Sequence, residues 1–359
     1  MPTSNPLFQM GPAQRDHIPA FRTALGVAIP MFTLLAIGRI DLAIYANFGA
    51  FTGVYGRHAT RQKRLKHHIL AGIALTLAVT IGATIAWFEL SPWLLMVVTA
   101  IASSLWATVA LKADMKPSGS VFVVFSVAAV GSVRNPVHPS LAFAIAGGAA
   151  LLCLVLGQLS QFIGEGPGGN AKPNEVPTRA PGAARLPWQR LAVEASRFFF
   201  SPLIAGTLGL ISVSLFDPLS HSYWAMVAAV APLVNSRFKM QYYRAIERVV
   251  GTLTGIAVAG FLLSHSPVGW QIVVWIVVLQ YLTEMYVTRN YTIAATFITP
   301  TALLMVQTVD AAPVAPMLLA RTAETVLGAF AALIIIAVGY VRTYPNVVLP
   351  RRVQRQPES

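Results

Sequence analysis

The chain has 359 residues, of which 55% are hydrophobic and only 11% are charged. A soluble globular domain carries about 25% charged residues, so this composition excludes an ordinary soluble protein and predicts a polytopic membrane protein. The formal net charge is +13, but the basic residues lie between long apolar runs, which is the pattern of the positive-inside rule and does not indicate a nucleic-acid partner.

The first half of the chain contains six apolar segments, each of which predicts a membrane helix. They lie near residues 21–40, 43–56, 68–89, 92–111, 119–133 and 140–163. A stretch rich in glycine and proline follows, and such a composition does not pack a hydrophobic core. We therefore expect residues 1–163 to form one membrane unit and residues 164–187 to form a flexible cytoplasmic linker.

The second half contains six further apolar segments. They lie near residues 198–216, 222–235, 249–264, 268–286, 291–308 and 314–341. We expect residues 188–343 to form a second membrane unit and residues 344–359 to form a basic cytoplasmic tail. The predicted fold class is an all-α membrane protein with about 12 transmembrane helices.

The two halves carry the same landmark residues at a nearly constant offset of 175 to 180 positions. This duplication predicts two parallel six-helix repeats, and in a membrane protein such repeats typically place a pathway or binding site where the copies meet. The matched pairs are Arg22 and Arg197, Asp41 and Asp217, Tyr45 and Tyr223, Arg57 and Arg237, Pro136 and Pro313, and Pro139 and Pro316.

Charge predicts the orientation of the chain in the bilayer. Basic residues fill the loops after the second, fourth and eighth segments, the linker and the tail, whereas the loops on the opposite side carry only Arg39 and Arg134. Positive charge favours the cytoplasmic side. We therefore expect a multi-pass protein of the plasma (inner) membrane with both termini in the cytoplasm.

The second segment of each half is unusually short, with 14 residues in 43–56 and 14 in 222–235. A full crossing needs about 20 residues. Each segment is therefore interpreted either as part of a helix that continues into the cytoplasm or as a short helix that meets a water-filled cavity. Short segments at matching positions of two repeats are typical of a transport site.

Arg321 and Glu324 lie within the last apolar segment. A charged side chain at the centre of a membrane helix costs about 2.5–3.5 kcal/mol on insertion scales, so each needs a partner or water. The two residues are three positions apart and share one helical face. They form either an ion pair that neutralises itself, or a site in which Arg321 holds a carboxylate and Glu324 orients it or accepts a proton.

Arg248 and Thr252 lie at the start of the ninth segment, in a run that also contains Gly251 and Gly255. Arg248 is interpreted either as an interfacial residue that reaches lipid headgroups or as an anion ligand. The two glycines form a small-residue stripe that favours close helix packing. We take Arg248 and Thr252 as candidate substrate-binding residues.

Tyr223 and Trp224 open the eighth segment. Aromatic residues at this depth usually belong to the belt at the membrane–water boundary, and the alternative is a stacking surface for an aromatic substrate. The first half has Leu141 opposite Arg321, and His67 and His68 near the position of Arg248. We therefore expect the second half to supply most of the fixed positive charge along a pathway.

The sequence shows no motif or residue spacing that is typical of a cofactor site, a metal site or an enzyme active site. Cys153 is the single cysteine, the histidines show no metal-ligand spacing, and no Gly-Lys-Ser/Thr phosphate-binding motif occurs. We expect no cofactor, no bound metal and no enzymatic activity.

The second half of the sequence resembles the fusaric acid resistance protein-like (FUSC) family of the aromatic acid exporter superfamily, which is related to the plant aluminium-activated malate transporters. The resemblance covers roughly residues 195–340, and the first half matches only in layout. The residues that carry it are Tyr223, Trp224, Pro232, Arg244, Glu247, Arg248, Gly251, Thr252 and Gly255, followed by Arg321, Glu324, Thr325 and Gly328.

This resemblance implies transmembrane movement of small organic anions, with Arg248 and Arg321 as anion-contacting residues. It also implies that two six-helix modules in one chain resemble a dimer built around a basic pore. We expect export of small organic or aromatic carboxylates between the repeats; a passive anion channel and a non-transporting structural membrane protein are the alternatives. Proton coupling through Glu324, Glu284 or Glu247, the direction of flux and assembly into a homo-oligomer are left open by the sequence.

Overall fold

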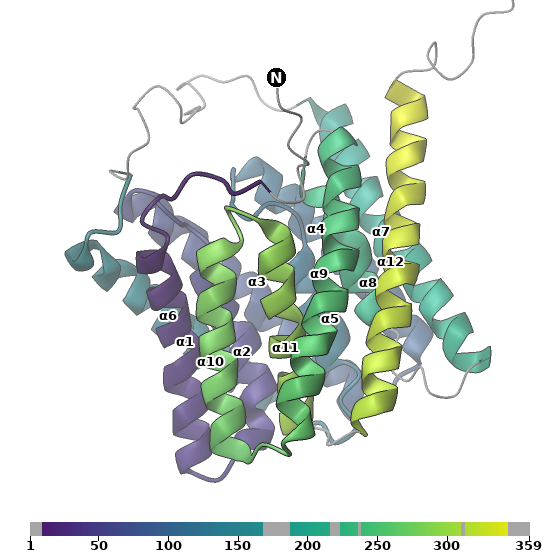
Figure 1. Cartoon of the computed structure of the whole chain (residues 1–359). Helices are drawn as coiled ribbons and strands as arrows, with labels where there is room; N and C mark the ends of the chain where they lie inside the picture. Colours follow the sequence, from purple (N-terminus) through teal and green to yellow (C-terminus); the bar gives the residue numbers. More distant parts are fainter. Residues whose placement is uncertain (1–8, 168–186, 216–222, 236–237, 310–312, 344–359) are drawn as a thin grey trace, which may run out of the picture.

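The computed structural model describes residues 9–167, 187–215, 223–235, 238–309 and 313–343. These residues form twelve α-helices and no strand, which confirms the prediction of an all-α protein (Figure 1). Eight of the described helices are long and apolar enough to cross a membrane. Most of the predicted linker and the whole predicted tail lie outside the described residues, as do Asp217 and Arg237.

The helices of the first half follow the predicted segments in number and order. The most visible difference is α5, which has only 10 residues. The bounds are α1 His17–Ala36, α2 Ala43–Ala50, α3 Arg61–Trp87, α4 Pro92–Lys112, α5 Val121–Val130 and α6 Pro139–Leu159.

The helices of the second half also follow the predicted segments in number and order, and they are longer on average than those of the first half. α7 starts at the first residues after the predicted linker, and α12 runs to Thr343. The bounds are α7 Trp188–Leu215, α8 Tyr223–Val230, α9 Phe238–Ser264, α10 Gly269–Tyr286, α11 Tyr291–Val309 and α12 Val314–Thr343.

Local sequence signals fix several helix starts. The Thr60 side chain accepts a hydrogen bond from the Lys63 backbone N–H at 3.4 Å and caps α3. Pro92 and Pro139 occupy the first turns of α4 and α6, where the missing N–H of proline has no cost. Pro139, one of the landmarks of the duplication, is therefore a helix-start signal.

The two short segments are broken helices. In the first half, α2 is flanked by the 3₁₀ turns η2 (Ile40–Leu42) and η3 (Phe51–Val54), and in the second half α8 is followed by η5 (Pro232–Val234). Neither continues into the next helix, because the chain turns before α3 and before α9 starts. The interpretation of a helix that extends into the cytoplasm is therefore wrong.

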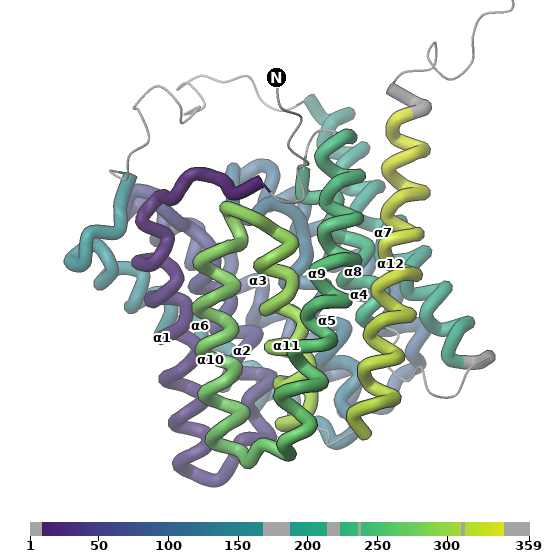
Figure 2. The backbone as a smooth tube through the Cα atoms, in the orientation of Figure 1, coloured from purple at the N-terminus to yellow at the C-terminus, as the bar shows by residue number. Residues whose placement is uncertain are grey.

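Helices of each half pack against helices of the other half. α1 packs along α10 and α4 packs along α7, while the short α5 contacts α8 and the short α2 contacts α11 (Figure 2). Within the halves, α2 packs on α6 and α8 on α12. A side chain on Gly49 of α2 would clash with the backbone of Ala146, and one on Gly328 of α12 would clash with the backbone of Ala225, so both close approaches require glycine.

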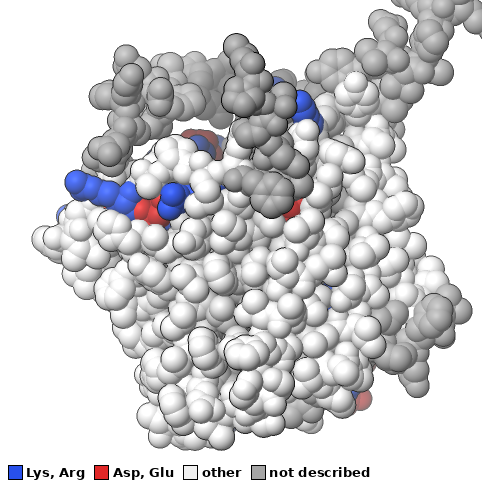
Figure 3. All heavy atoms as spheres, in the orientation of Figure 1, with Lys and Arg blue, Asp and Glu red and all other residues white. Residues whose placement is uncertain are grey.

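Charged side chains avoid the middle of the outer surface. On the face shown in Figure 3, lysines and arginines gather along the rim next to the N-terminal segment, above a broad surface of other residues. Phe21, Ile29 and Phe32 of α1 are each more than 40% exposed on this outside. An apolar exterior of this extent is what a helix bundle presents to lipid tails.

Candidate functional site

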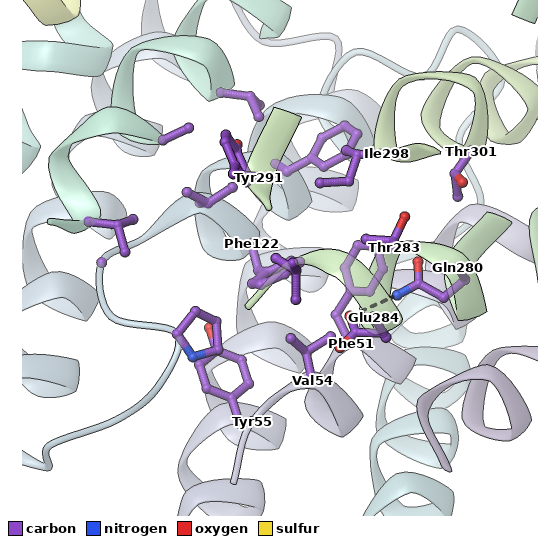
Figure 4. A pocket seen from close by; sticks show the side chains of 18 of the residues that line it. Phe51, Val54, Tyr55, Phe122, Gln280, Thr283, Glu284, Tyr291, Ile298 and Thr301 are labelled. Carbon is purple, nitrogen blue, oxygen red and sulfur yellow. Dashed lines mark hydrogen bonds between the residues drawn. The ribbon is translucent and has the colours of Figure 1, made fainter. Parts of the chain in front are cut away.

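A cavity of about 240 Å³ lies where the two halves meet (Figure 4). Its first-half wall comes from α2, η3, α5 and the loop between α4 and α5, and its second-half wall comes from α8 to α11. Both short segments therefore end at a cavity, which was the second interpretation of their length. The aromatic part of the wall is formed by Phe51, Tyr55, Phe122 and Phe125.

Three arginines face this largely apolar cavity from different helices and loops. Arg57 lies after η3, and Arg244 and Arg248 lie one turn apart on α9. The Nε atom of each is buried and has no hydrogen-bond partner among the described residues. A buried donor without a partner is costly and rare in a folded protein. These three Nε–H groups are therefore available to bind a hydrogen-bond acceptor in the cavity.

Arg57 pairs with one carboxylate from each half, Asp16 of the first and Glu284 of the second. Its Nη1 lies 3.3 Å from Oε2 of Glu284 on α10, its Nη2 donates to the backbone carbonyl of Glu284 at 2.6 Å, and the same Nη2 lies 3.8 Å from Oδ1 of Asp16. Gln280 donates to the other Glu284 oxygen at 3.2 Å (Figure 4). The Arg57 and Glu284 side chains are 10% and 3% exposed, so this ion pair is almost dry.

Tyr291 is held by the two arginines of α9. The Arg244 guanidinium lies over its ring with 3.3 Å to the centroid, and Arg248 Nη1 donates to its hydroxyl at 3.1 Å. Arg244 and Tyr291 also line a second hollow of about 480 Å³, which is formed by the N-terminal segment, the start of α9 and the loop between α10 and α11. The stacked pair therefore separates the inner cavity from this second hollow.

Comparison with known proteins identifies the second half. Residues 204–335 match the family model described as "Fusaric acid resistance protein-like". This part of the chain, somewhat more than a third of it, is therefore similar to that family. A relative named "Uncharacterized membrane protein YvaC" from Bacillus subtilis (strain 168) is 33% identical over 110 residues, which are 30% of this chain and 17% of that protein. The chain thus spans about a sixth of the length of this curated relative, and no solved structure matches it.

The match to this family model confirms the resemblance that was drawn from the motifs. The several long apolar helices likewise indicate a membrane protein. Proteins of the fusaric acid resistance protein-like family are generally transporters and not enzymes.

Of the six residues predicted to bind substrate, Arg248 lines the cavity and the other five lie away from it. Arg321, Glu324 and Trp224 form one buried cluster between α8 and α12. The Arg321 guanidinium lies 4.0 Å from the Trp224 ring centroid, and Glu324 accepts a hydrogen bond from the Trp224 backbone N–H at 3.1 Å. Arg321 is 1% exposed, and its Nε and Nη1 have no hydrogen-bond partner among the described residues.

The remaining two predicted residues occupy separate places. Thr252 is buried on α9, where its hydroxyl has no hydrogen-bond partner in the described part of the chain. Tyr223 lines another cavity of about 250 Å³ between α4, α7 and α8. Tyr223 and Trp224 are 4% and 0% exposed, so the interpretation of both as a lipid-facing aromatic belt is wrong. The residues that open α8 point inward because α8 packs on α5 and α12.

At this cavity the second half does not supply most of the fixed positive charge. Arg57 and Lys116 of the first half line the cavity together with Arg244 and Arg248 of the second. Sequence reasoning missed Arg57 as a site residue because it follows an apolar run and is read as a cytoplasmic loop residue. The signal that pointed to it was its place directly after a short segment.

The first half also buries a cluster of charge of its own, formed by Arg22, Arg64, His68 and Glu165. Arg22 binds Glu165 with two bonds, Nε–Oε2 at 2.8 Å and Nη2–Oε1 at 3.0 Å, and its Nη1 donates to the Gly53 carbonyl at 2.6 Å. Burial opposes ionisation of Glu165, but the Arg22 guanidinium outweighs it and holds the pKa of this carboxyl below its usual value. His68 belongs to this cluster and is fully buried.

Proposed function

We propose that the protein moves small organic or aromatic carboxylates across the plasma (inner) membrane through the cavity between its two halves, in the direction of export. The observation that carries the proposal is the set of three arginines with unpartnered Nε atoms around a mostly apolar cavity. Guanidinium groups bind carboxylates with charge-assisted hydrogen bonds, and the aromatic wall suits an aromatic body. The similarity of residues 204–335 to a family of transporters supports the same function.

The two-repeat architecture is part of this proposal. The pairs α1–α10 and α7–α4 link corresponding helices of opposite halves, as do α2–α11 and α8–α5. Reciprocal packing of this kind is what two parallel repeats related by an axis along the membrane normal would produce. In this arrangement both termini lie on the cytoplasmic side, and the cavity lies on the repeat interface.

Arg321 and Glu324 are assigned to the same path as a further anion contact, with Thr252, Tyr223 and Trp224 beside it. Arg321 lies within electrostatic reach of Arg248 and Tyr291, and two of its nitrogens have no hydrogen-bond partner among the described residues. An anion that leaves the cavity past Arg248 would meet this second guanidinium group. The Trp224 ring, which lies on Arg321, would have to shift to admit it.

The test is export from cells of a panel of acids, namely benzoate, 4-hydroxybenzoate, hippurate, malate and succinate, with and without the gene. Arg248→Gln should lower the flux about tenfold or more, because it removes a charged hydrogen bond from the cavity. Arg39→Gln is the matched control, since Arg39 forms an exposed ion pair with Asp41, with the arginine side chain 49% exposed. Equal export with and without the gene for all five acids would refute the proposal, and a voltage-driven hippurate current without any ion gradient would replace it with a channel.

A further inference from the structure

The cavity that we propose as a substrate anion site also contains an anionic side chain, that of Glu284. Glu284 lines the same cavity as Arg57, and its carboxylate lies on the Arg57 guanidinium, 3.3 Å from Nη1. A substrate carboxylate that binds Arg57 must therefore compete with Glu284 for it. The competition is local, because both side chains of the Arg57–Glu284 pair line the cavity, whereas Arg244 of the lining pairs with Glu247, which does not line it.

Loss of Arg57 as a partner would be costly for Glu284 as long as it is ionised. Its side chain is 3% exposed, and removal of one partner from a buried ion pair leaves an uncompensated buried charge. Gln280 supplies only a neutral hydrogen bond to Glu284. A proton on Glu284 removes the cost, since a neutral carboxylic acid needs no counter-ion.

The other charged groups around Glu284 do not replace Arg57. Arg22 of α1 acts on Glu284 from a distance and is engaged by Glu165. Asp16, before α1, adds negative charge to the same network, and His58 lies 3.6 Å from it. On the cavity side, the nearest elements contribute Lys116, Arg244 and Arg248, which are the groups available to the substrate.

A line of polar groups leads from this pair towards solvent. Arg57 Nη2 lies 3.8 Å from Asp16 Oδ1, and the partly exposed His58 Nε2 lies 3.6 Å from the same oxygen, with the His58 side chain 24% exposed. Burial and the neighbouring Arg57 lower the pKa of His58, so its imidazole is neutral at pH 7 and can accept a proton and pass it on. Thr288 donates to Asp16 at 3.2 Å and fixes this carboxylate in place.

We propose that Glu284 is the coupling acid of this transporter, and that one proton moves with each anion in the same direction. The anion binds Arg57, Glu284 takes one proton from water through Asp16 and His58, and both are released on the other side, where Glu284 loses the proton and pairs with Arg57 again. No electron is transferred and no bond other than O–H forms or breaks. This inference rests on the proposed function, and it adds to it the stoichiometry and direction of the coupling ion.

The experiment uses the full chain in liposomes loaded with hippurate, whose polar amide and low pKa keep it from crossing lipid unaided, together with a trapped pH dye. Efflux of hippurate with a proton should make the lumen alkaline, and the flux should not respond to an imposed voltage, since the pair is neutral. Malate, with two negative charges, should move with one net negative charge and respond to voltage. Protein-free liposomes give the background.

Glu284→Gln should keep hippurate flux within about threefold, abolish the alkaline change in the lumen and make the flux voltage-dependent, because the glutamine imitates the protonated acid permanently. Glu284→Asp keeps a titratable acid and should keep the pH change, which tests coupling even if the glutamine variant is poorly folded. Glu89→Gln is the matched control, since Glu89 is exposed in the loop between α3 and α4.

Two results overturn the inference and can be told apart. An acid change in the lumen during wild-type efflux, or an unchanged pH signal in Glu284→Gln, refutes Glu284 as the coupling acid but leaves anion transport in place. An absence of flux for hippurate and malate in the wild-type protein, when the cells of the export panel also show none, refutes the proposed function itself.

Discussion

The starts of α3 and α9 carry basic residues at matching positions, and the two halves use them differently. Arg64 and His68 lie 180 positions before Arg244 and Arg248. In the first half, every nitrogen of Arg64 has a partner: Nε binds the Gly157 carbonyl at 2.7 Å, and the others bind Ala59 and Glu165. In the second half, the Nε atoms of Arg244 and Arg248 have none among the described residues.

This difference separates a structural cluster from a binding surface. The first-half cluster is closed by Glu165, which follows α6 and returns into the bundle, and neither Arg64 nor His68 lines the cavity. The corresponding place beside α9 is filled by Tyr291, a neutral aromatic residue, and Arg244 reaches Glu247 of its own helix at 3.7 Å, while the Nε atoms of Arg244 and Arg248 have no partner among the described residues. The repeated sequence therefore gives repeated helices, but only the first half closes its basic cluster with a fully buried carboxylate, that of Glu165.

The largest effect is expected from Glu165→Gln, which opens the closed cluster. Arg22 and Arg64 would be left buried without a full counter-ion, at a cost of about 3–5 kcal/mol of stability. Because the folded-state pKa of Glu165 is lowered, its stabilisation is complete above its unfolded value of about 4.3 and is lost as the pH falls through the lower folded value. Thermal unfolding of the purified protein in detergent at several pH values measures both effects.

The control for this variant is Asp114→Asn, since Asp114 pairs with Lys63 at the surface and both side chains are about half exposed. Such a pair contributes about 0–1 kcal/mol. A Glu165→Gln protein that melts at the wild-type temperature would show that the buried cluster is not the stabilising element described above.

The second effect in size is expected from Arg321→Ala, which tests whether the second half contains one anion contact or two. If Arg321 receives the anion after Arg248, its loss should lower flux about tenfold to hundredfold while the protein still inserts and accumulates. Quantitative blotting of membranes and the export panel give the two readings. Normal transport in this variant would make Arg321 a structural partner of Trp224, and failure to accumulate would favour the self-neutralising ion pair.

The helices were predictable because their signals are local. Long apolar runs, turn-forming glycine and proline, and Pro139 at a helix start placed α6 to within one residue of its predicted beginning. α1 starts at His17, four residues before the predicted segment, and its first turn (residues 17–20) is too short and too mixed in polarity to extend the apolar run. Periodicity likewise does not show that α2 and α8 stop in 3₁₀ turns at a cavity.

The site was less predictable because its decisive contacts join distant parts of the chain. Arg57 and Glu284 are 227 positions apart, and no local pattern links them. Arg321 was singled out because a charge in an apolar run needs a partner, but the sequence does not say whether that partner is water, a substrate or the face of Trp224. Arg248 was a candidate because it lies at the start of an apolar segment and in the motif that carries the family resemblance, and both signals are local.

The smallest effect is expected from Tyr291→Phe, which changes the binding surface without changing its charge. The variant loses the hydroxyl that accepts from Arg248 at 3.1 Å and keeps the ring on which Arg244 lies. One hydrogen bond contributes about 0.5–1.5 kcal/mol, so affinity for the anion should change by about two- to tenfold. The direction is informative: Arg248, released from the hydroxyl, gains a donor for substrate, and the KM for carboxylate efflux should fall.

Tyr291→Leu removes the ring as well, which frees Arg244 and opens the partition towards the second hollow, so it should also raise the maximal rate. A rise in KM for Tyr291→Phe would mean that the tyrosine positions Arg248 for the anion instead of competing for it, and the second half would then resemble the closed cluster more than this comparison allows.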